Sequence, residues 1–262
     1  MWSTMENQRP LVLVTGASSG IGEALARRIA RDGHPLLLVA RRKEKLDVLA
    51  ADLPVETLTL ALDLMDAEAG ERVVAAVEES GRPLGVLVNN AGFGDTGDFA
   101  ETDRRKQVGM VDLNVRALVD LTHRFLPGLL ARRSGGILNL SSTAAYQPGP
   151  GMAVYYASKS FVLSFSEALS EEVRGSGVTV TALCPGPTTT EFGAVSGMDR
   201  SRIFRLARHM TAEDVAEIGW RGFLGGRRTV VTGFQNRLTA ASAPFVPKRI
   251  LLPVVKRLQG TG

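Results

Sequence analysis

The sequence predicts a single doubly wound α/β domain, with a parallel sheet of about seven strands and helices on both of its faces. Short apolar runs alternate with longer amphipathic segments along most of the chain. A glycine-rich turn follows the first apolar run. No linker rich in Pro, Gly or Ser divides the 262 residues, and there are no repeats, so one large domain is expected rather than two small ones.

The apolar runs, beginning with LVLVT, are expected to form the strands. Strands that are buried on both faces give nearly continuous apolar runs, which is typical of a parallel sheet covered by helices. The expected strands are residues 11–15, 35–40, 56–64, 84–90, 135–142, 178–185 and 229–233.

The segments between the runs have the charge and leucine spacing of helices, as in RKEKLDVLAADL at 42–53. The expected helices are residues 20–31, 42–53, 67–80, 108–133, 154–174 and 212–224. In an open sheet of this kind the ligand binds at the carboxyl ends of the strands.

Composition excludes several classes of protein. With 44% hydrophobic and 22% charged residues the chain is an ordinary globular protein. One cysteine, Cys184, excludes an internal disulfide framework, and His34, His123 and His209 lack metal-ligand spacing, so no metal site is expected. The net charge of +4 gives little support for a nucleic-acid partner.

The N-terminal segment MWSTMENQRP lacks the basic-then-apolar pattern of a signal peptide, and no apolar run approaches the length of a membrane span. A cytoplasmic protein is therefore expected. The basic excess lies at the other end of the chain, where no acidic residue follows Glu217.

The segment TGASSGIG at 15–22 predicts a phosphate-binding turn of the Rossmann type. Glycines let the chain turn sharply and let its backbone approach a pyrophosphate, which then meets the N-terminus of the next helix. The expected coenzyme-binding residues of this turn are Gly16, Ser18, Ser19, Gly20, Ile21 and Gly22.

The end of the second strand indicates the coenzyme. An NAD-binding unit places a carboxylate there, whereas this chain continues from Ala40 into Arg41 and Arg42. Arginine binds phosphate with two parallel hydrogen bonds, so we interpret the pair as a site for the 2′-phosphate of NADP(H). The alternative is that RRKEK is only a solvated helix start.

Six motifs in order resemble the short-chain dehydrogenase/reductase family over residues 10–233. They are TGxxxGxG at Thr15–Gly22, NNAG at Asn89–Gly92, the helix asparagine at Asn114, a serine ending the fifth strand, YxxxK, and PG at Pro185–Gly186. Tyr155 lies four residues before Lys159, and Ser142 lies 13 residues before Tyr155, which is the interval of the family. This interval favours Tyr155 over its neighbour Tyr156.

The resemblance implies a catalytic set of Asn114, Ser142, Tyr155 and Lys159. Tyr155 would act as general acid and base, with its pKa lowered by the Lys159 ammonium. Ser142 would orient the substrate oxygen, Lys159 would also hold the nicotinamide ribose, and Asn114 would fix a water that connects Lys159 to solvent.

The resemblance also assigns further coenzyme contacts. They are Asp63 near the adenine, Asn89, Ala91 and Gly92 on the adenosine and ribose side, Tyr155 and Lys159 at the nicotinamide ribose, and Pro185, Gly186, Thr188 and Thr190 after the sixth strand. Asn90 is expected to tie the central strands together instead.

A largely apolar substrate pocket is expected, formed by Phe93, Tyr146, Met152 and Phe192 around Ser142, with Met198 nearby. Residues 187–210 are rich in small side chains and are expected to form a substrate lid. Three parts are thus expected: an N-terminal tail (1–10), an NADP-binding catalytic domain (11–235) and a basic C-terminal extension (236–262).

The expected function is an NADP(H)-dependent oxidoreductase that transfers a hydride between the nicotinamide and the carbonyl or alcohol of a hydrophobic substrate, such as a ketoacyl, steroid-like or aromatic compound. The alternative is a nucleotide-binding regulatory protein of the same fold; an extended-type sugar-nucleotide epimerase is disfavoured by the glycine spacing. By resemblance, a homodimer or homotetramer is expected through the two long helices.

The extension alternates apolar clusters with basic pairs. Similar tails occur in reductases of this family that handle lipid-like substrates. A weak contact of the extension with a membrane surface is therefore one interpretation. We favour packing over the substrate cleft or a neighbouring subunit, since its prolines oppose one continuous amphipathic helix.

Overall fold

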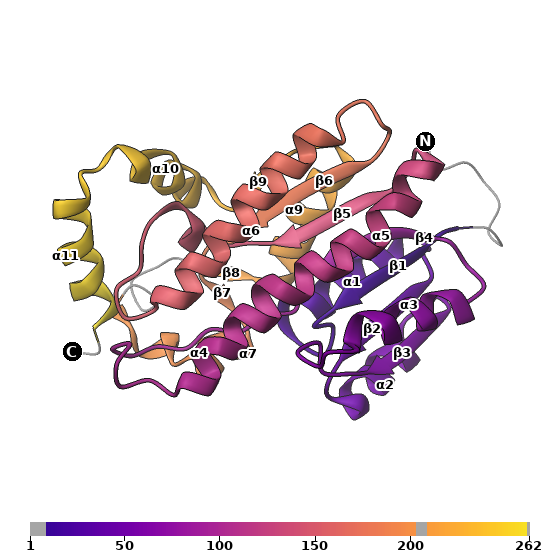
Figure 1. Ribbon diagram of the computed structural model, residues 1–262, viewed down its shortest axis with the longest axis horizontal. Coiled ribbons are helices and arrows are strands. Elements are labelled where there is room, and N and C mark those ends of the chain that lie inside the picture. Colours follow the sequence, from indigo (N-terminus) through magenta and orange to yellow (C-terminus); the bar gives the residue numbers. More distant parts are fainter. Residues whose placement is uncertain (1–8, 203–208, 261–262) are drawn as a thin grey trace.

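A seven-stranded, fully parallel sheet forms the centre of the molecule (Figure 1). The computed structural model describes residues 9–202 and 209–260. The strand order is β3-β2-β1-β4-β5-β6-β9, as expected for a doubly wound fold. The strands are β1 (Leu11–Thr15), β2 (Leu36–Ala40), β3 (Thr57–Ala61), β4 (Leu84–Asn89), β5 (Gly136–Leu140), β6 (Thr179–Cys184) and β9 (Thr229–Val231).

Helices cover both faces of the sheet, which explains the apolar strands. The helices are α1 (Gly20–Arg31), α2 (Lys43–Asp52), α3 (Ala69–Glu79), α4 (Arg104–Val111), α5 (Leu118–Arg132), α6 (Ala153–Glu172), α7 (Glu191–Ser196), α9 (Ala212–Leu224), α10 (Phe234–Ser242) and α11 (Lys248–Gln259). Helices α1, α2 and α9 pack in one core, and α3, α5 and α6 pack in the core on the other face. Trp220, fully buried on α9, anchors the first core and donates to Asp32 at the end of α1 (2.7 Å).

The crevice for a ligand lies where the winding reverses. Strand β1 pairs with β2 on one side and with β4 on the other. The connections that follow β1 and β4 therefore leave toward opposite faces of the sheet, which opens a gap between them at the carboxyl ends.

The long helix expected over 108–133 begins earlier and is not uniform. Its first part, α4, starts after Asp103, whose carboxylate accepts a hydrogen bond from the Arg105 backbone N–H (2.8 Å). A π-helical turn over Asp112–Ala117 then joins α4 to α5 and carries Asn114. Such turns often occur at functional sites.

Two short strands, β7 (Thr188–Thr189) and β8 (Met210–Thr211), pair with each other beside the main sheet. They bracket the segment expected as a lid over 187–210. Residues 203–208 of that segment, and residues 1–8 of the expected N-terminal tail, lie outside the described residues.

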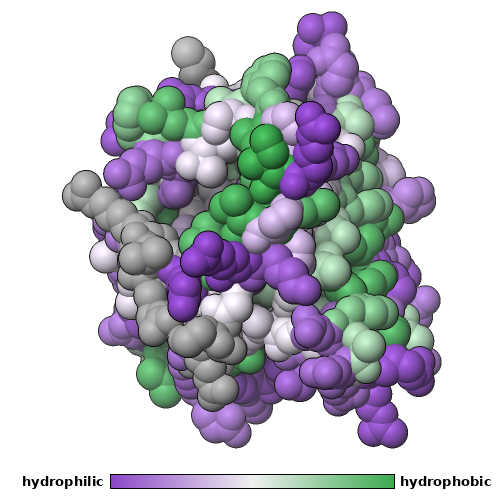
Figure 2. Space-filling view, turned by 90° about the vertical axis from the view of Figure 1, so that its left-hand side faces the viewer, coloured by the Kyte–Doolittle hydropathy of each residue, from purple (hydrophilic) through white to green (hydrophobic). Residues whose placement is uncertain are grey.

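The C-terminal extension folds into α10, a short 3-10 turn (Ala243–Phe245) and α11, at one end of the molecule (Figure 1). The expectation that prolines would interrupt a helix was wrong for α11, which is continuous although Pro253 lies inside it. Figure 2 faces this end and shows hydrophobic residues beside hydrophilic ones. Exposed apolar side chains here are Phe234, Leu238, Phe245, Ile250 and Val254. None of the helices in the described ranges has the length and apolar character needed to cross a membrane.

Candidate active site

A cavity of about 520 Å³ lies at the carboxyl ends of the strands. It is lined by most of the residues expected at the coenzyme and the substrate: Gly16, Ser18, Ser19, Gly20, Ile21, Arg41, Arg42, Asp63, Ala91, Gly92, Phe93, Ser142, Tyr146, Tyr155, Lys159, Pro185, Gly186, Thr188, Thr190 and Phe192. Gly22, Asn89, Asn114 and Met152 are not among its lining residues.

The glycine turn between β1 and α1 is packed too tightly for side chains. Gly16 has a φ of +65°, and a Cβ added to it would lie 2.8 Å from the Cα of Ala91. A Cβ on Gly22 would lie 2.3 Å from the Asn90 Nδ2 atom. Gly22, which is expected at the coenzyme, therefore serves the close packing of the turn and does not line the cavity.

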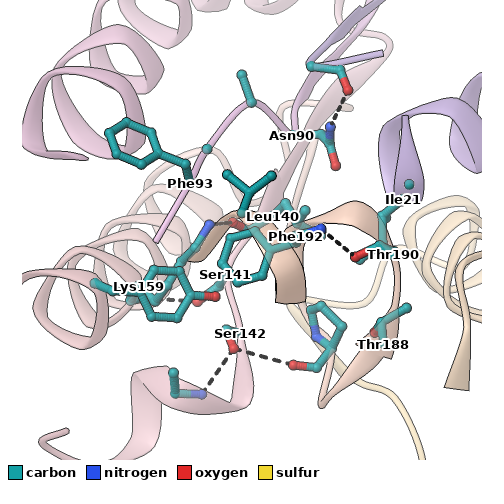
Figure 3. Close-up of a pocket in the computed structure, with 18 of the residues that line it drawn as sticks. Ile21, Asn90, Phe93, Leu140, Ser141, Ser142, Lys159, Thr188, Thr190 and Phe192 are labelled. Atoms are coloured by element: carbon teal, nitrogen blue, oxygen red, sulfur yellow. Dashed lines mark hydrogen bonds between the residues drawn. The ribbon is translucent and has the colours of Figure 1, made fainter. Parts of the chain in front are cut away.

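Asn89, which is expected at the coenzyme, does not line the cavity. Its buried side chain donates to the Asn139 Oδ1 atom on β5 (2.9 Å) and to the Thr122 hydroxyl on α5 (3.1 Å). Asn90 donates to the carbonyl oxygens of Thr15 (2.8 Å) and Gly16 (3.2 Å), so it ties the end of β4 to the glycine turn. Asn90 also lines the cavity (Figure 3), in addition to the structural role expected for it.

The arginine pair stands at the rim of the cavity beside the glycine turn. Arg41 is exposed and lies 3.8 Å from the Asp63 carboxylate. The Arg42 guanidinium donates to the hydroxyls of Ser18 (3.1 Å) and Ser19 (2.8 Å), and to Glu191 (2.8 Å). Glu191 was not expected here, because it lies in the segment assigned to the lid.

The catalytic candidates meet where β5 ends against α6 (Figure 3). The Lys159 ammonium donates to the Leu140 carbonyl (2.9 Å) and lies 5.9 Å from the centre of the Tyr155 ring. Ser142 donates to the Pro185 carbonyl (3.4 Å) and accepts from the Ala144 backbone N–H (3.1 Å). Two residues of one helix and one strand-end hydroxyl thus converge on the same wall of the cavity.

Burial dominates the acid–base properties of this wall. It raises the pKa of Tyr155 above its ordinary value, while a hydrogen bond with Ser142 acts in the opposite direction. The expectation that the pKa of Tyr155 is lowered was therefore wrong. Burial also lowers the pKa of Lys159 to about 8. At neutral pH the phenol is protonated and the lysine is largely charged.

Asn114 lies behind the cavity wall rather than in it. From the π-helical turn its amide donates to the Phe93 carbonyl (3.0 Å) and to the Ser158 hydroxyl (3.1 Å), and its oxygen accepts from the Phe93 N–H (3.1 Å). A Cβ on Gly92 would lie 2.9 Å from the Asn114 oxygen and 3.5 Å from the Lys159 nitrogen. The space that a side chain at position 92 would fill therefore adjoins both the Asn114 oxygen and the Lys159 ammonium.

The substrate end of the cavity is mostly apolar. Met152 was expected to line it but is buried beneath the wall with Met110, Tyr155 and Tyr156. Tyr156 lines the cavity, and its hydroxyl accepts from the Gln259 side chain of α11 (2.6 Å). The C-terminal extension, expected to pack over the substrate cleft or a neighbouring subunit, contributes four lining residues that were not named in advance: Asn236, Thr239, Ala240 and Ala243.

Cys184 is a buried core residue, as expected from its sequence context, and burial raises the pKa of its thiol to about 11. The Tyr146 hydroxyl donates to its sulfur (3.9 Å). The described parts of the chain contain no group of His, Cys, Asp and Glu side chains that could hold a metal ion.

A doubly wound sheet with a glycine-lined crevice at its switch point defines a dinucleotide-binding α/β protein. Comparison with known proteins identifies the family: the family model described as short chain dehydrogenase matches residues 10–200, and the chain belongs to this family of oxidoreductases.

Relatives and solved structures agree with this assignment. The chain is 42% identical to sulfoacetaldehyde reductase 2 of Chromohalobacter salexigens, over 79% of this chain and 86% of that protein. It is 37% identical to serine 3-dehydrogenase of Agrobacterium fabrum, over 78% and 84%. A solved short-chain dehydrogenase from Sphingobium yanoikuyae, in complex with NADPH, has a TM-score of 0.80 and 33% identity, covering 90% of this chain and 93% of that one.

Proposed function

We propose that the protein is an NADP(H)-dependent oxidoreductase that interconverts a carbonyl and an alcohol on a hydrophobic substrate. One observation supports this more than any other. Ser142, Tyr155 and Lys159 line one end of a single cavity, and the glycine turn with Arg41 and Arg42 lines the other end.

The coenzyme end fits a 2′-phosphorylated dinucleotide. The turn lines the cavity from Gly16 to Ile21, so a pyrophosphate could approach its backbone and the N-terminus of α1. Arg41 and Arg42 supply two guanidiniums for a 2′-phosphate, and Asp63 lines the same end of the cavity. The relative from Sphingobium yanoikuyae, which binds NADPH, supports the choice of coenzyme.

The nicotinamide ring, when bound, would supply or accept the hydride. In the direction of reduction, Tyr155 would donate its phenolic proton to the carbonyl oxygen as negative charge develops there. Its raised pKa keeps that proton available at neutral pH. The Ser142 hydroxyl would turn from its long bond with the Pro185 carbonyl to donate to the same oxygen.

Lys159 would favour the phenolate that this proton transfer leaves. Its ammonium lies 5.9 Å from the ring centre and is excluded from solvent, so the attraction is little screened. By its resemblance to the family, Asn114 would position a water that connects Lys159 to solvent and so resupplies the proton; Gly92, which has no side chain, leaves open the space beside both residues.

The apolar side chains at the substrate end favour a hydrophobic carbonyl. Phe93, Tyr156, Phe192, Val195 and Met198 all line this part of the cavity. The named relatives act on sulfoacetaldehyde and serine, which are small and polar, so the substrate class must be tested on this chain itself.

The experiment is to follow NADPH oxidation over a panel of ketoacyl, steroid-like, aromatic and small charged carbonyl compounds, with NADH run in parallel. We expect turnover of the hydrophobic members with NADPH. Activity on small charged compounds alone would reject the substrate class, and faster turnover with NADH would reject the role of the arginine pair.

A further inference from the structure

Glu191 connects two parts of the cavity that are far apart in sequence. It is the first residue of α7, and its carboxylate accepts from the Arg42 guanidinium (2.8 Å) and the Lys45 ammonium (2.5 Å) at the start of α2. Arg42 also donates to Ser18 and Ser19 of the glycine turn. One carboxylate thus holds Arg42, one of the two arginines expected at the 2′-phosphate, together with Lys45 three residues further along the chain.

This ion-pair group lies at the solvent-accessible rim, where about half of the Glu191 side chain is exposed. Lys45 and Arg42 lower the pKa of Glu191 to about 2, so its charge is constant over the range in which proteins work. A carboxylate and a phosphate accept from a guanidinium with similar geometry. The two groups would therefore occupy the same face of Arg42.

The next residue along the chain acts at the other end of the cavity. The Phe192 ring packs against the Tyr155 ring, with 5.4 Å between their centres, and lines the cavity. The Phe192 ring also lies close to Gly94, since a Cβ added to Gly94 would lie 3.0 Å from the Phe192 Cζ atom. Consecutive residues of α7 therefore contact the cations at the coenzyme end and the tyrosine at the substrate end.

We propose that Glu191 is an internal competitor for the 2′-phosphate of the coenzyme. It occupies Arg42 and Lys45 until a 2′-phosphorylated nucleotide displaces it. This displacement frees the start of α7, and with it the Phe192 ring, which packs against the Tyr155 ring. Glu191 thereby limits the affinity for the 2′-phosphorylated coenzyme and couples its binding to access of substrate. The inference rests on the proposed NADP(H) specificity.

The test compares full-length wild type with Glu191→Gln, which keeps the shape of the side chain but removes its charge. The matched control is Glu44→Gln, which makes the same charge change on an exposed residue of α2. Fluorescence titration without substrate gives the Kd of each protein for NADPH and for NADH. We expect Glu191→Gln to bind NADPH roughly three- to tenfold more tightly, since two exposed ion pairs of modest strength no longer compete.

NADH binding should be the same in all three proteins, and the control should match wild type for both coenzymes. Equal or weaker NADPH binding by Glu191→Gln would overturn the proposal, as would equal tightening for NADH. A wild type that does not prefer NADPH to NADH would instead contradict the proposed function, so the two failures are distinguishable.

A second measurement, made without any coenzyme, tests whether the ion pairs of Glu191 hold α7 against α2. Hydrogen exchange of the amides at 192–196 should be faster in Glu191→Gln than in wild type and in Glu44→Gln, because α7 loses its only charged link to α2 among the described residues. Equal exchange in the three proteins would show that Glu191 does not hold α7.

Discussion

The adjacent tyrosines of α6 differ in what their hydroxyls contact. Tyr155 forms a hydrogen bond with Ser142, whereas Tyr156 accepts from Gln259. We expect Tyr155→Phe to lower kcat by at least about 10²-fold, the lower range of general acid catalysis, because the proton donor is lost. NADPH oxidation measures the loss, and a fluorescence titration should show NADPH binding preserved.

The control for this prediction is Tyr156→Phe. It removes only the hydrogen bond to Gln259 and leaves the ring in place, so most of the turnover should remain. Equal losses in the two variants would contradict the assignment of Tyr155, and loss of NADPH binding in Tyr155→Phe would show that the change acts through structure.

Lys159 sets the expected pH dependence of reduction. Burial lowers its pKa from 10.5 to about 8, so the ammonium is lost as the pH rises through about 8, while the raised pKa of Tyr155 keeps the phenol protonated. We expect kcat/KM for reduction to be constant below about pH 8 and to fall about tenfold per pH unit above it. A profile that remains flat to pH 10 would contradict a role for the Lys159 charge.

At the scale of elements, the strands could be predicted because burial on both faces leaves apolar runs that few other structures produce. Boundaries were less predictable. Strand β3 ends at Ala61 rather than 64, which leaves Asp63 in the loop at the rim of the cavity. The π-helical turn around Asn114 was not predicted, because such turns are rare and occur as single turns inside α-helices.

The site was predictable where chemistry follows local spacing and unpredictable where folding joins distant segments. Ser142, Tyr155 and Lys159 were assigned because their intervals match those of the short-chain dehydrogenase/reductase family, and all three line the cavity. Asn90 lines the cavity and Asn89 does not, because neighbouring residues at a strand end point to opposite sides, so one position decides between core and cavity. Glu191 and Ala240 reach the cavity only through tertiary packing, which no motif records.

Helix α10 is expected to limit the size of the substrate. Ala240 is buried and lines the cavity, whereas its neighbour Ala241 is exposed. Ala240→Leu should raise KM for bulky ketones roughly tenfold, since added methylenes in a packed site cost about 1–3 kcal/mol. Small aldehydes should be affected less, and NADPH binding should not change.

Ala241→Leu is the matched control, because it adds the same atoms to the solvent-facing side of the same helix. Steady-state kinetics on a bulky and a small carbonyl compound would measure both variants. Equal KM values for Ala240→Leu and wild type on the bulky compound would show that α10 does not shape the substrate site.

At the scale of the whole molecule, the extension is attached to the catalytic domain rather than free. Val255 and Gln259 of α11 are buried, and Gln259 bonds to Tyr156. These contacts favour the interpretation that the extension packs over the substrate end. The basic side chains of α11, Lys248, Arg249, Lys256 and Arg257, are all exposed, so they would also be free to meet an anionic surface.

Assembly through the long helices is the remaining expectation at this scale. The outer face of α6 carries Phe161, 41% exposed and stacked on Phe165, and the adjoining α4 exposes Val108 and Val111. Apolar side chains grouped in this way are typical of an interface between subunits. We expect wild type to be a dimer or tetramer by size-exclusion chromatography with light scattering.

Phe161→Asp should weaken that assembly, because a charge would be buried without a partner at the centre of the interface. The dissociation constant should rise at least about 30-fold, which corresponds to the loss of about 2 kcal/mol at a binding hot spot. Phe99→Asp is the control, since Phe99 is also exposed but lies in the loop that precedes α4 rather than on either helix. Circular dichroism would show that both variants fold. A wild type that is monomeric at micromolar concentration would exclude the subunit contact. A Phe161→Asp variant whose assembly has the same mass as wild type would place the contact elsewhere.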